Sequence, residues 1–256
     1  MAFTPYIAKD RYLFEHRFDF RIANETGKSW YDGSQNQWMA EREWCVKHLK
    51  KGMTVVDCGA HHGMLSVIFS KVVGDQGKVF AYEALPSNAS VIQENAQINS
   101  LRNIIVRPVG VGASNGMVSI ISNASNTVVV HGENGTSDAE NEKIRIVRLD
   151  DDLQKDTKVD FLKIDVEGFD LYALQGMPET LGQAPILDLE IHNFLFKDVE
   201  KTLTEILKIL APLRYEWTIL GEISGEPVSA GKKLSVQDII VFNNPHLFGV
   251  PLVSTR

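Results

Sequence analysis

Hydrophobic and polar residues follow two alternating periodicities from about residue 53 onward. Short β-branched runs, typical of buried strands, are each followed by a stretch whose apolar residues recur every three to four positions. The clearest pair is the run Thr54–Cys58 with the helix predicted over Met64–Val73, which Gly74 ends. Strands and helices in this order predict right-handed crossovers and a parallel sheet.

The remaining elements continue the same pattern. Further strands are predicted at 78–83, 103–106, 159–165, 185–190 and 215–220, and helices at 37–50, 87–100, 169–181 and 199–210. The last strand is expected at 237–242, as the second arm of a hairpin with 215–220. Together they predict an α/β fold with a doubly wound, Rossmann-like, seven-stranded sheet whose final strand is antiparallel.

Two segments depart from this pattern. Residues 1–50 mix aromatic and charged residues and predict an N-terminal helical or irregular cap on a domain formed by residues 51–256. Residues 112–148 hold short strand-like runs separated by Gly, Asn and Ser, which predict a small β insertion at the sheet edge or over the site. Its polar stretch 133–141 is expected to be a partly mobile loop.

Composition and charge narrow the class of protein. The chain has 256 residues and a formal net charge of −7, which disfavours bulk nucleic acid as its main partner. Its two cysteines form no disulfide framework, and Cys58 is expected to be a buried, inert thiol. Neither a signal peptide nor a run of 18 apolar residues is visible, so we expect a cytoplasmic protein with no membrane partner.

The first candidate site is the turn Asp57–Gly63, which joins the first strand to its helix. Ligands of doubly wound sheets bind beyond the carboxyl ends of the strands, and Gly59 lets the backbone approach a ligand closely. His61 takes the middle glycine position of a dinucleotide fingerprint, which disfavours a pyrophosphate. The following helix N-terminus favours an anionic group. The alternative is a tight turn without a ligand.

Glu83 ends the second strand, roughly 20 residues after the glycine turn. An acid at this place can accept hydrogen bonds from both hydroxyls of a ribose. An exposed acid at a strand end is the alternative. Taken together, the turn and the acid indicate a cofactor that carries an adenosyl group.

Three segments in this order resemble the FkbM family of methyltransferases: residues 53–106 beginning "MTVVDCGAHHG", then "PVGVGASNGMVSI", then "VDFLKIDVEGFDLYALQGM". The resemblance covers roughly residues 37–195. It implies the class I fold of methyltransferases that use S-adenosylmethionine (SAM), and methyl transfer mostly to hydroxyl oxygens of sugars, polyketides, peptides or other secondary metabolites.

By position, the resemblance also implies which residues hold the cofactor. Asp57, Gly59 and Gly63 would border the methionine part of SAM, with His61 in the same turn. Glu83 would bind the ribose, and the Gly110–Val111 turn would flank the adenine. His61 and its neighbour His62 depart from the small or amide pair that the family more often has there.

Polar residues at the end of strand four are candidates for catalysis. A hydroxyl must lose its proton as it attacks the methyl carbon, so a base or a metal helps. Asp165 and Glu167 are candidate bases or metal ligands, and Lys163 is a candidate base if desolvation lowers its pKa. An extended strand would place the three on one side. For Lys163, an ion pair across the sheet is the alternative.

Glu190 and His192 end strand five, beside strand four, and are expected to meet Asp165. Asp165, Glu190 and His192 could bind a divalent cation such as Mg²⁺, or His192 could be the general base itself. A structural, hydrogen-bonded His192 is the alternative. The remaining histidines show no such grouping: His16, His48, His62, His131 and His246.

These observations favour a SAM-dependent O-methyltransferase with a small-molecule or glycan acceptor. The aromatic residues Trp30, Tyr31 and Trp38 are expected to pack between cap and sheet, with a lid over the site as the alternative. Two other functions stay open: an NAD(P)-dependent oxidoreductase, which His61 disfavours, and a non-catalytic interaction module. The oligomeric state is also open, a homodimer being one option.

Overall fold

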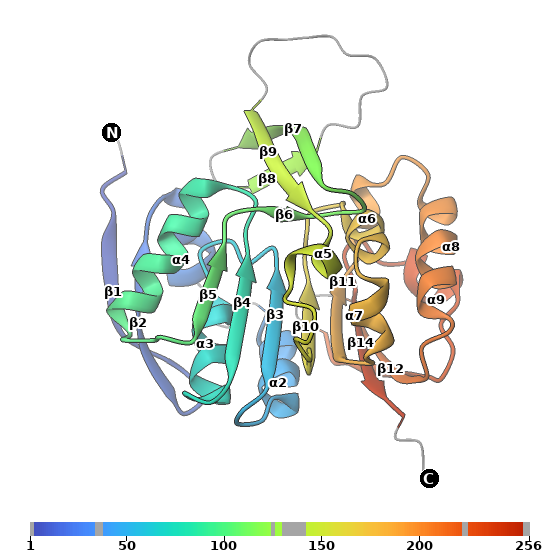
Figure 1. Ribbon diagram of the computed structural model, residues 1–256, viewed down its shortest axis with the longest axis horizontal. Coiled ribbons are helices and arrows are strands. Elements are labelled where there is room, and N and C mark those ends of the chain that lie inside the picture. The colour runs from blue at the N-terminus through green and yellow to red at the C-terminus, as the bar shows by residue number, and fades with distance from the viewer. Residues whose placement is uncertain (1–2, 34–37, 124–125, 130–141, 222–224, 253–256) are drawn as a thin grey trace.

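The computed structural model describes residues 3–33, 38–123, 126–129, 142–221 and 225–252. The loop predicted at 133–141 and His131 lie outside these residues. Within them, eight strands form a central sheet in the order β13-β12-β14-β11-β10-β3-β4-β5 (Figure 1). The strands are β3 (Thr54–Cys58), β4 (Lys78–Tyr82), β5 (Ile104–Arg107), β10 (Phe161–Ile164), β11 (Ile186–Glu190), β12 (Tyr215–Leu220), β13 (Val228–Gly231) and β14 (His246–Pro251).

Five neighbouring strands, β5-β4-β3-β10-β11, are parallel, and β14 pairs antiparallel with β11. These five strands, β14 and β12 are the seven strands that were predicted, and β13 is an additional strand at the edge beside β12. The prediction of a strand at 237–242 is wrong, because helix α9 (Val236–Ile240) forms there. The strand that pairs antiparallel with β12 and β11 is β14 instead. The apolar run favoured a strand, but a capping box between Ser235 and Asp238 starts a helix.

Helices cover both faces of the sheet, as the doubly wound prediction requires. On one face Val55 packs with Phe69 of α3 (Met64–Val73) and Cys45 of α2 (Met39–His48). On the other, Leu162 packs with the buried residues of α6 (Asp170–Gln175) and α8 (Val199–Leu210). Helix α4 (Pro86–Ile98) joins the first group. The predicted helix 169–181 is two helices, because Pro178 begins α7 (Pro178–Gly182).

The N-terminal residues fold differently from the prediction. A hairpin of β1 (Tyr6–Leu13) and β2 (His16–Ile22) replaces the expected helical or irregular chain, and α1 (Glu25–Gly27) and a π-helical turn (Lys28–Asp32) follow it. Phe18, Phe20 and Ile22 alternate with charged residues along β2 and bury their side chains against α3. This two-residue period is the pattern of a half-buried strand.

A second sheet with the order β6-β9-β7-β8 lies beyond the carboxyl ends of the parallel strands (Figure 1). Its strands are β6 (Gly110–Val111), β7 (Gly116–Asn123), β8 (Asn126–Val129) and β9 (Glu142–Val147). The short helix α5 (Leu149–Asp152) leads from it back to the main sheet. The described parts of the segment 112–148 therefore lie over the sheet edge where ligands of this fold bind.

Candidate active site

A cavity of about 340 Å³ opens at the carboxyl ends of β3, β4, β10 and β11. This volume lies within the usual range of small-molecule sites. The lining comes from the strand ends, the glycine turn, α2, the π-helical turn and the β insertion. Every residue predicted for the site lines it except Gly63, which lies in the turn just before Met64 of the lining.

The glycine turn is held tightly against the end of β10. Gly59 has a φ of +83°, and a Cβ at this position would overlap the carbonyl oxygen of Asp165. Gly63 has a φ of +81°, and its Cβ would lie 2.9 Å from Cγ2 of Ile92. His61 also takes a left-handed conformation, with a φ of 52°. These conformations explain why glycine occupies positions 59 and 63.

Asp57, at the floor of the turn, is 1% exposed and accepts a 2.5 Å hydrogen bond from the Ser66 hydroxyl. Burial raises its pKa to about 6, against the lowering effects of Lys163 and Ser66. A buried carboxylate that borders a cavity can accept hydrogen bonds from a cationic group placed there.

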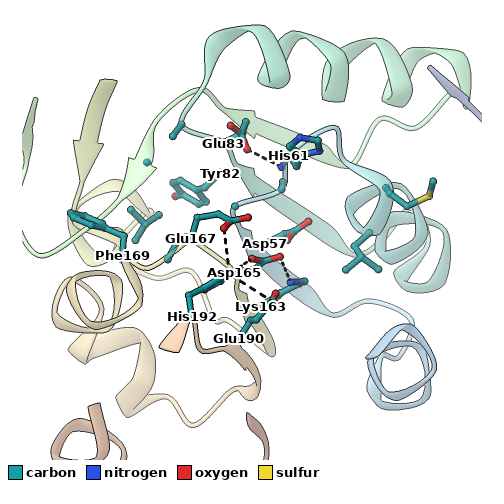
Figure 2. Close-up of a pocket in the computed structure, with 18 of the residues that line it drawn as sticks. Asp57, His61, Tyr82, Glu83, Lys163, Asp165, Glu167, Phe169, Glu190 and His192 are labelled. Atoms are coloured by element: carbon teal, nitrogen blue, oxygen red, sulfur yellow. Dashed lines mark hydrogen bonds and ion pairs between the residues drawn. The ribbon is translucent and has the colours of Figure 1, made fainter. Parts of the chain in front are cut away.

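Glu83 is not the exposed acid of the alternative interpretation, since it is 7% exposed and lines the cavity. Its carboxylate accepts hydrogen bonds from the backbone N–H groups of His61 (2.8 Å) and Leu85 (2.9 Å) (Figure 2). Burial raises its pKa to about 7, although these N–H groups favour the ionised form. The acid is therefore fixed between the glycine turn and the end of β4.

The end of the cavity beside Glu83 is apolar. Gly110 and Val111 of β6 line it together with Ile144 and Ile146 of β9 and the ring of Phe169. Their small and apolar side chains leave a slot suited to a flat, weakly polar ring.

Lys163 is 3% exposed, and its Nζ lies 3.1 Å from Oδ2 of Asp165 and 3.3 Å from Oε1 of Glu41. Burial alone would lower its pKa, but Asp165, Glu41, Asp188 and Glu190 outweigh burial and hold the pKa of Lys163 well above its usual range. Lys163 is thus ion-paired in this structure, with Asp165 of its own segment and Glu41 of α2 rather than across the sheet, and its role as a base stays a prediction.

Asp165, Glu167, Glu190 and His192 point toward one another (Figure 2). Asp170 fixes His192, accepting a 3.0 Å hydrogen bond from its backbone N–H and lying 3.2 Å from Nδ1. The other ring nitrogen, Nε2, lies 3.6 Å from Asp165, 3.7 Å from Glu167 and 3.9 Å from Glu190.

The pKa values of His192, Asp165 and Glu190 are shifted in different directions. Burial would lower the pKa of His192, but Asp170 and the other carboxylates raise it to about 10. Burial would raise the pKa of Asp165, but Lys163 and His192 hold it well below its usual range. Burial and the nearby Asp165 raise the pKa of Glu190. Asp165, Glu190 and His192 are the predicted metal ligands. Each offers one nitrogen or oxygen atom that could bind a metal ion, and these three atoms lie within 4.8 Å of one another.

The prediction that His246 belongs to no grouping is wrong. His246 faces Glu190 across the β11–β14 pair, and its Nδ1 lies 2.8 Å from Oδ1 of Asp188. Its Nε2 lies 3.7 Å from Glu190. Asp188 and the other carboxylates raise the pKa of His246 to about 10, although burial opposes this. The last strand was expected at 237–242 instead of at β14, so the sequence pattern did not place His246 beside Glu190.

The aromatic residues of the N-terminal segment reach the site. Trp30, Tyr31 and Trp38 all line the cavity. The Tyr31 hydroxyl lies 2.6 Å from Nδ1 of His61, and the rings of Trp30 and His61 are 4.8 Å apart. Trp30, Tyr31 and Trp38 therefore do more than pack between the N-terminal segment and the sheet, because they also form one wall of the cavity.

The sheet order and the placement of the cavity are those of class I SAM-dependent methyltransferases. The chain belongs to the FkbM methyltransferase family: the Methyltransferase FkbM domain matches residues 57–216, more than half of the chain. This confirms the resemblance and sets aside the oxidoreductase alternative. Within the described residues, no helix is long and apolar enough to cross a membrane.

Three proteins of known structure or curated sequence illustrate what the chain is similar to. An FkbM methyltransferase from Methylobacillus flagellatus KT is 18% identical, with a TM-score of 0.49 over 82% of this chain and 51% of its own. Aeropyrum pernix fibrillarin with bound SAM is 12% identical, with a TM-score of 0.46 over 83% of this chain and 76% of its own. The ribosomal RNA large subunit methyltransferase E of Hahella chejuensis is 38% identical over 81 residues, 30% of this chain and 37% of that protein. The chain thus spans only about a third of that curated relative and about half of the M. flagellatus chain.

The residues of the cavity fit SAM. Glu83 offers carboxylate oxygens to a diol, and the apolar lining at Val111 suits adenine. The acids Asp57, which is buried, and Asp165, which is partly exposed, favour the positive charge that the ammonium and sulfonium groups carry.

Proposed function

We propose that the protein transfers a methyl group from SAM to a hydroxyl oxygen of a small sugar-containing or secondary-metabolite acceptor. The observation that carries this proposal is the His192–Glu190 pair, which faces the cavity at the carboxyl ends of β10 and β11 and is fixed from behind by Asp170. The pair lies beside the cofactor's expected position and apart from the apolar slot.

In this proposal the methionine part of SAM lies over the turn at Asp57, Gly59 and Gly63, next to His61. Glu83 accepts hydrogen bonds from the ribose, and Gly110–Val111 flanks the adenine. When bound, SAM supplies an electrophilic methyl carbon to the acceptor oxygen. The ends of β10 and β11 then remain for the acceptor.

The lining at that end supports a polyhydroxylated acceptor. Glu167 and Glu190 present carboxylate oxygens, which accept hydrogen bonds from hydroxyl groups. Phe194, which is 60% exposed, offers an apolar face at the same end. A sugar has both hydroxyl donors and apolar C–H faces, so it complements this lining.

In this proposal Glu190 accepts the proton, because burial and Asp165 raise its pKa and so make its carboxylate a stronger base. Oε1 of Glu190 lies 3.9 Å from Nε2 of His192, whose pKa is raised to about 10, so a hydroxyl placed between them would pass its proton to Glu190 while the protonated His192 stabilises the developing negative charge on the oxygen. Lys163 suits this task less because it is held protonated, and Asp165 because its lowered pKa makes it a weak base. Asp165, Glu190 and His192 could instead hold Mg²⁺, so the assay includes an arm with the metal.

Charge favours a small acceptor over RNA. Six acidic residues line the cavity: Glu41, Asp57, Glu83, Asp165, Glu167 and Glu190. Of the described residues lining it, only Arg42 and Lys163 are lysines or arginines, and Lys163 is paired with two of these acids. Such a surface repels a phosphate backbone. The similarity to a ribosomal RNA methyltransferase makes RNA the comparison substrate in the test.

The test is an acceptor screen with methyl-labelled SAM, using saccharides, hydroxylated secondary metabolites and RNA, with and without magnesium. We expect label in a hydroxylated small molecule and none in RNA. His192→Ala should abolish transfer while binding S-adenosylhomocysteine as the wild type does, and His48→Ala is the control. Labelled RNA alone would contradict the proposed acceptor. No labelled acceptor of any kind, with S-adenosylhomocysteine bound, would favour the interaction module.

A further inference from the structure

We infer that Arg42 binds the methionine carboxylate of SAM, an inference that rests on the cofactor orientation proposed above. Arg42 lies on α2 and lines the cavity. It also lines a smaller neighbouring cavity together with Tyr31 and Met64, and the Tyr31 hydroxyl lies 2.6 Å from Nδ1 of His61. These contacts place Arg42 near the glycine turn, where the methionine part is expected.

Arg42 is 9% exposed, and among the described residues no carboxylate makes an ion pair or hydrogen bond with its guanidinium. Its Cζ lies 5.8 Å from the centroid of the Trp38 ring. Glu41, the adjacent acid, pairs with Lys163 instead.

Burying a charge without an opposite charge is unfavourable in the free protein, and an anion placed beside it would offset that cost. A cation–π contact offsets only part of it. SAM carries a single anionic group, its carboxylate. The guanidinium can hold a carboxylate by two parallel hydrogen bonds, which a lysine cannot do.

Two further features favour the carboxylate at this end of the cavity. Helix α3 has ten residues and begins at Met64, so its free N–H groups and positive dipole end lie beside the same stretch of lining. Apart from Arg42 and the histidines, the charged side chains of the described lining are acids and Lys163. Lys163 is already neutralised by Glu41 and Asp165. Among the described lysines and arginines of the lining, Arg42 is therefore the uncommitted one.

Arg42 also lines a neighbouring cavity of about 130 Å³ beneath the N-terminal hairpin. Arg11 lines this second cavity too, but its guanidinium forms a 2.8 Å ion pair with Asp32. Arg11→Gln is therefore a matched control: it removes an arginine from the same region without removing one from the cofactor cavity.

The test compares three ligands by calorimetry at fixed ionic strength: S-adenosylhomocysteine, its decarboxylated analogue and 5′-methylthioadenosine, which lacks the whole amino acid end. We expect Arg42→Gln to weaken S-adenosylhomocysteine by about 30-fold or more. The decarboxylated analogue should bind the wild type at least about tenfold more weakly than S-adenosylhomocysteine. Neither it nor methylthioadenosine should distinguish Arg42→Gln from the wild type. Arg11→Gln should bind all three as the wild type does.

Wild-type affinity for S-adenosylhomocysteine in Arg42→Gln would overturn the inference, and so would equal weakening of all three ligands. If Arg42→Gln does not fold, the comparison of S-adenosylhomocysteine with its decarboxylated analogue on the wild type decides, and equal affinities would overturn the inference. Failure of the proposed function looks different: S-adenosylhomocysteine binds as expected, but no hydroxyl acceptor is methylated.

Discussion

Gly59 packs the turn after β3 against the end of β10, because a Cβ at this position would overlap the carbonyl oxygen of Asp165. We expect Gly59→Ala to lower the free energy of unfolding by about 2–4 kcal/mol, since it adds both a steric overlap and left-handed strain. Urea denaturation measures this change. Gly116→Ala is the control, because nothing lies within 4 Å of a Cβ there. An equal, small effect of both substitutions would show that the turn can relax.

Lys163 pairs with the buried carboxylate of Glu41 and the partly exposed carboxylate of Asp165, so its removal should destabilise the protein in a pH-dependent way. Lys163→Met leaves Glu41 and Asp165 without their cation and should lower the free energy of unfolding by about 3–5 kcal/mol at pH 7. Asp165 has a lowered pKa in the folded protein, so its contribution is present above the unfolded pKa of 3.8 and is lost as pH falls through the folded pKa.

The difference between wild type and Lys163→Met should therefore shrink in acid, toward pH 3. Chemical denaturation of both proteins between pH 3 and pH 8 measures it, with Lys158→Met as control because Lys158 pairs with Asp160 at the surface. A difference that stays constant across this range would mean that lost packing, rather than lost charge, explains the effect.

At the same scale, the sequence predicted which residues meet but not their protonation. Asp165, Glu190 and His192 converge because parallel strands end at one edge of the sheet, a consequence of topology that a sequence can reveal. The raised pKa of His192 depends on Asp170, the first residue of α6, whose Oδ1 lies 3.2 Å from Nδ1 of His192. Glu41 reaches Lys163 from a helix more than 100 residues away, a contact that no local pattern encodes.

At the scale of elements, prediction succeeded where local signals agree. Helix α3 has an apolar face and a glycine on each side, and α8 has Asp198 as its N-cap, so both match their predicted ranges. The hairpin β1–β2 was missed although Phe18 and Phe20 alternate with charged residues. Aromatic residues spread through this segment obscured a period that spans only one strand.

The hairpin stabilises the site through Phe20, which is 1% exposed and lies in an edge contact 5.2 Å from the ring of Tyr31. Phe20→Ala should lower the free energy of unfolding by about 3–5 kcal/mol and free Tyr31 from its place beside His61. Denaturation and hydrogen exchange over residues 6–22 measure both effects. Tyr12→Ala, at a side chain that is 59% exposed, should change stability by less than about 0.5 kcal/mol. Equal effects would mean that the hairpin adds nothing to the core.

At the scale of the whole molecule, helix α3 packs against three parts of the protein: the N-terminal hairpin, helix α2 and the main sheet. Asn95 of α4 accepts a hydrogen bond from the backbone N–H of Arg21 and donates one to the carbonyl of His62, joining the hairpin to the glycine turn. The cofactor cavity has walls from both segments. Residues 1–50 and 51–256, predicted as cap and domain, are therefore expected to unfold together.

Calorimetry should show one transition, with the calorimetric and van't Hoff enthalpies equal. S-adenosylhomocysteine at about 100 times its Kd should add about 2.7 kcal/mol and raise the midpoint by roughly 5–10 °C, without splitting the peak. NADH is the control and should leave the midpoint unchanged. Two peaks, of which the ligand moves only one, would mean that the aromatic wall formed by Trp30, Tyr31 and Trp38 is not coupled to the sheet. A single shifted peak would make the N-terminal segment an integral part of the cofactor site, because the same cooperative unit would then contain Arg42, the glycine turn and the acids at the ends of β10 and β11.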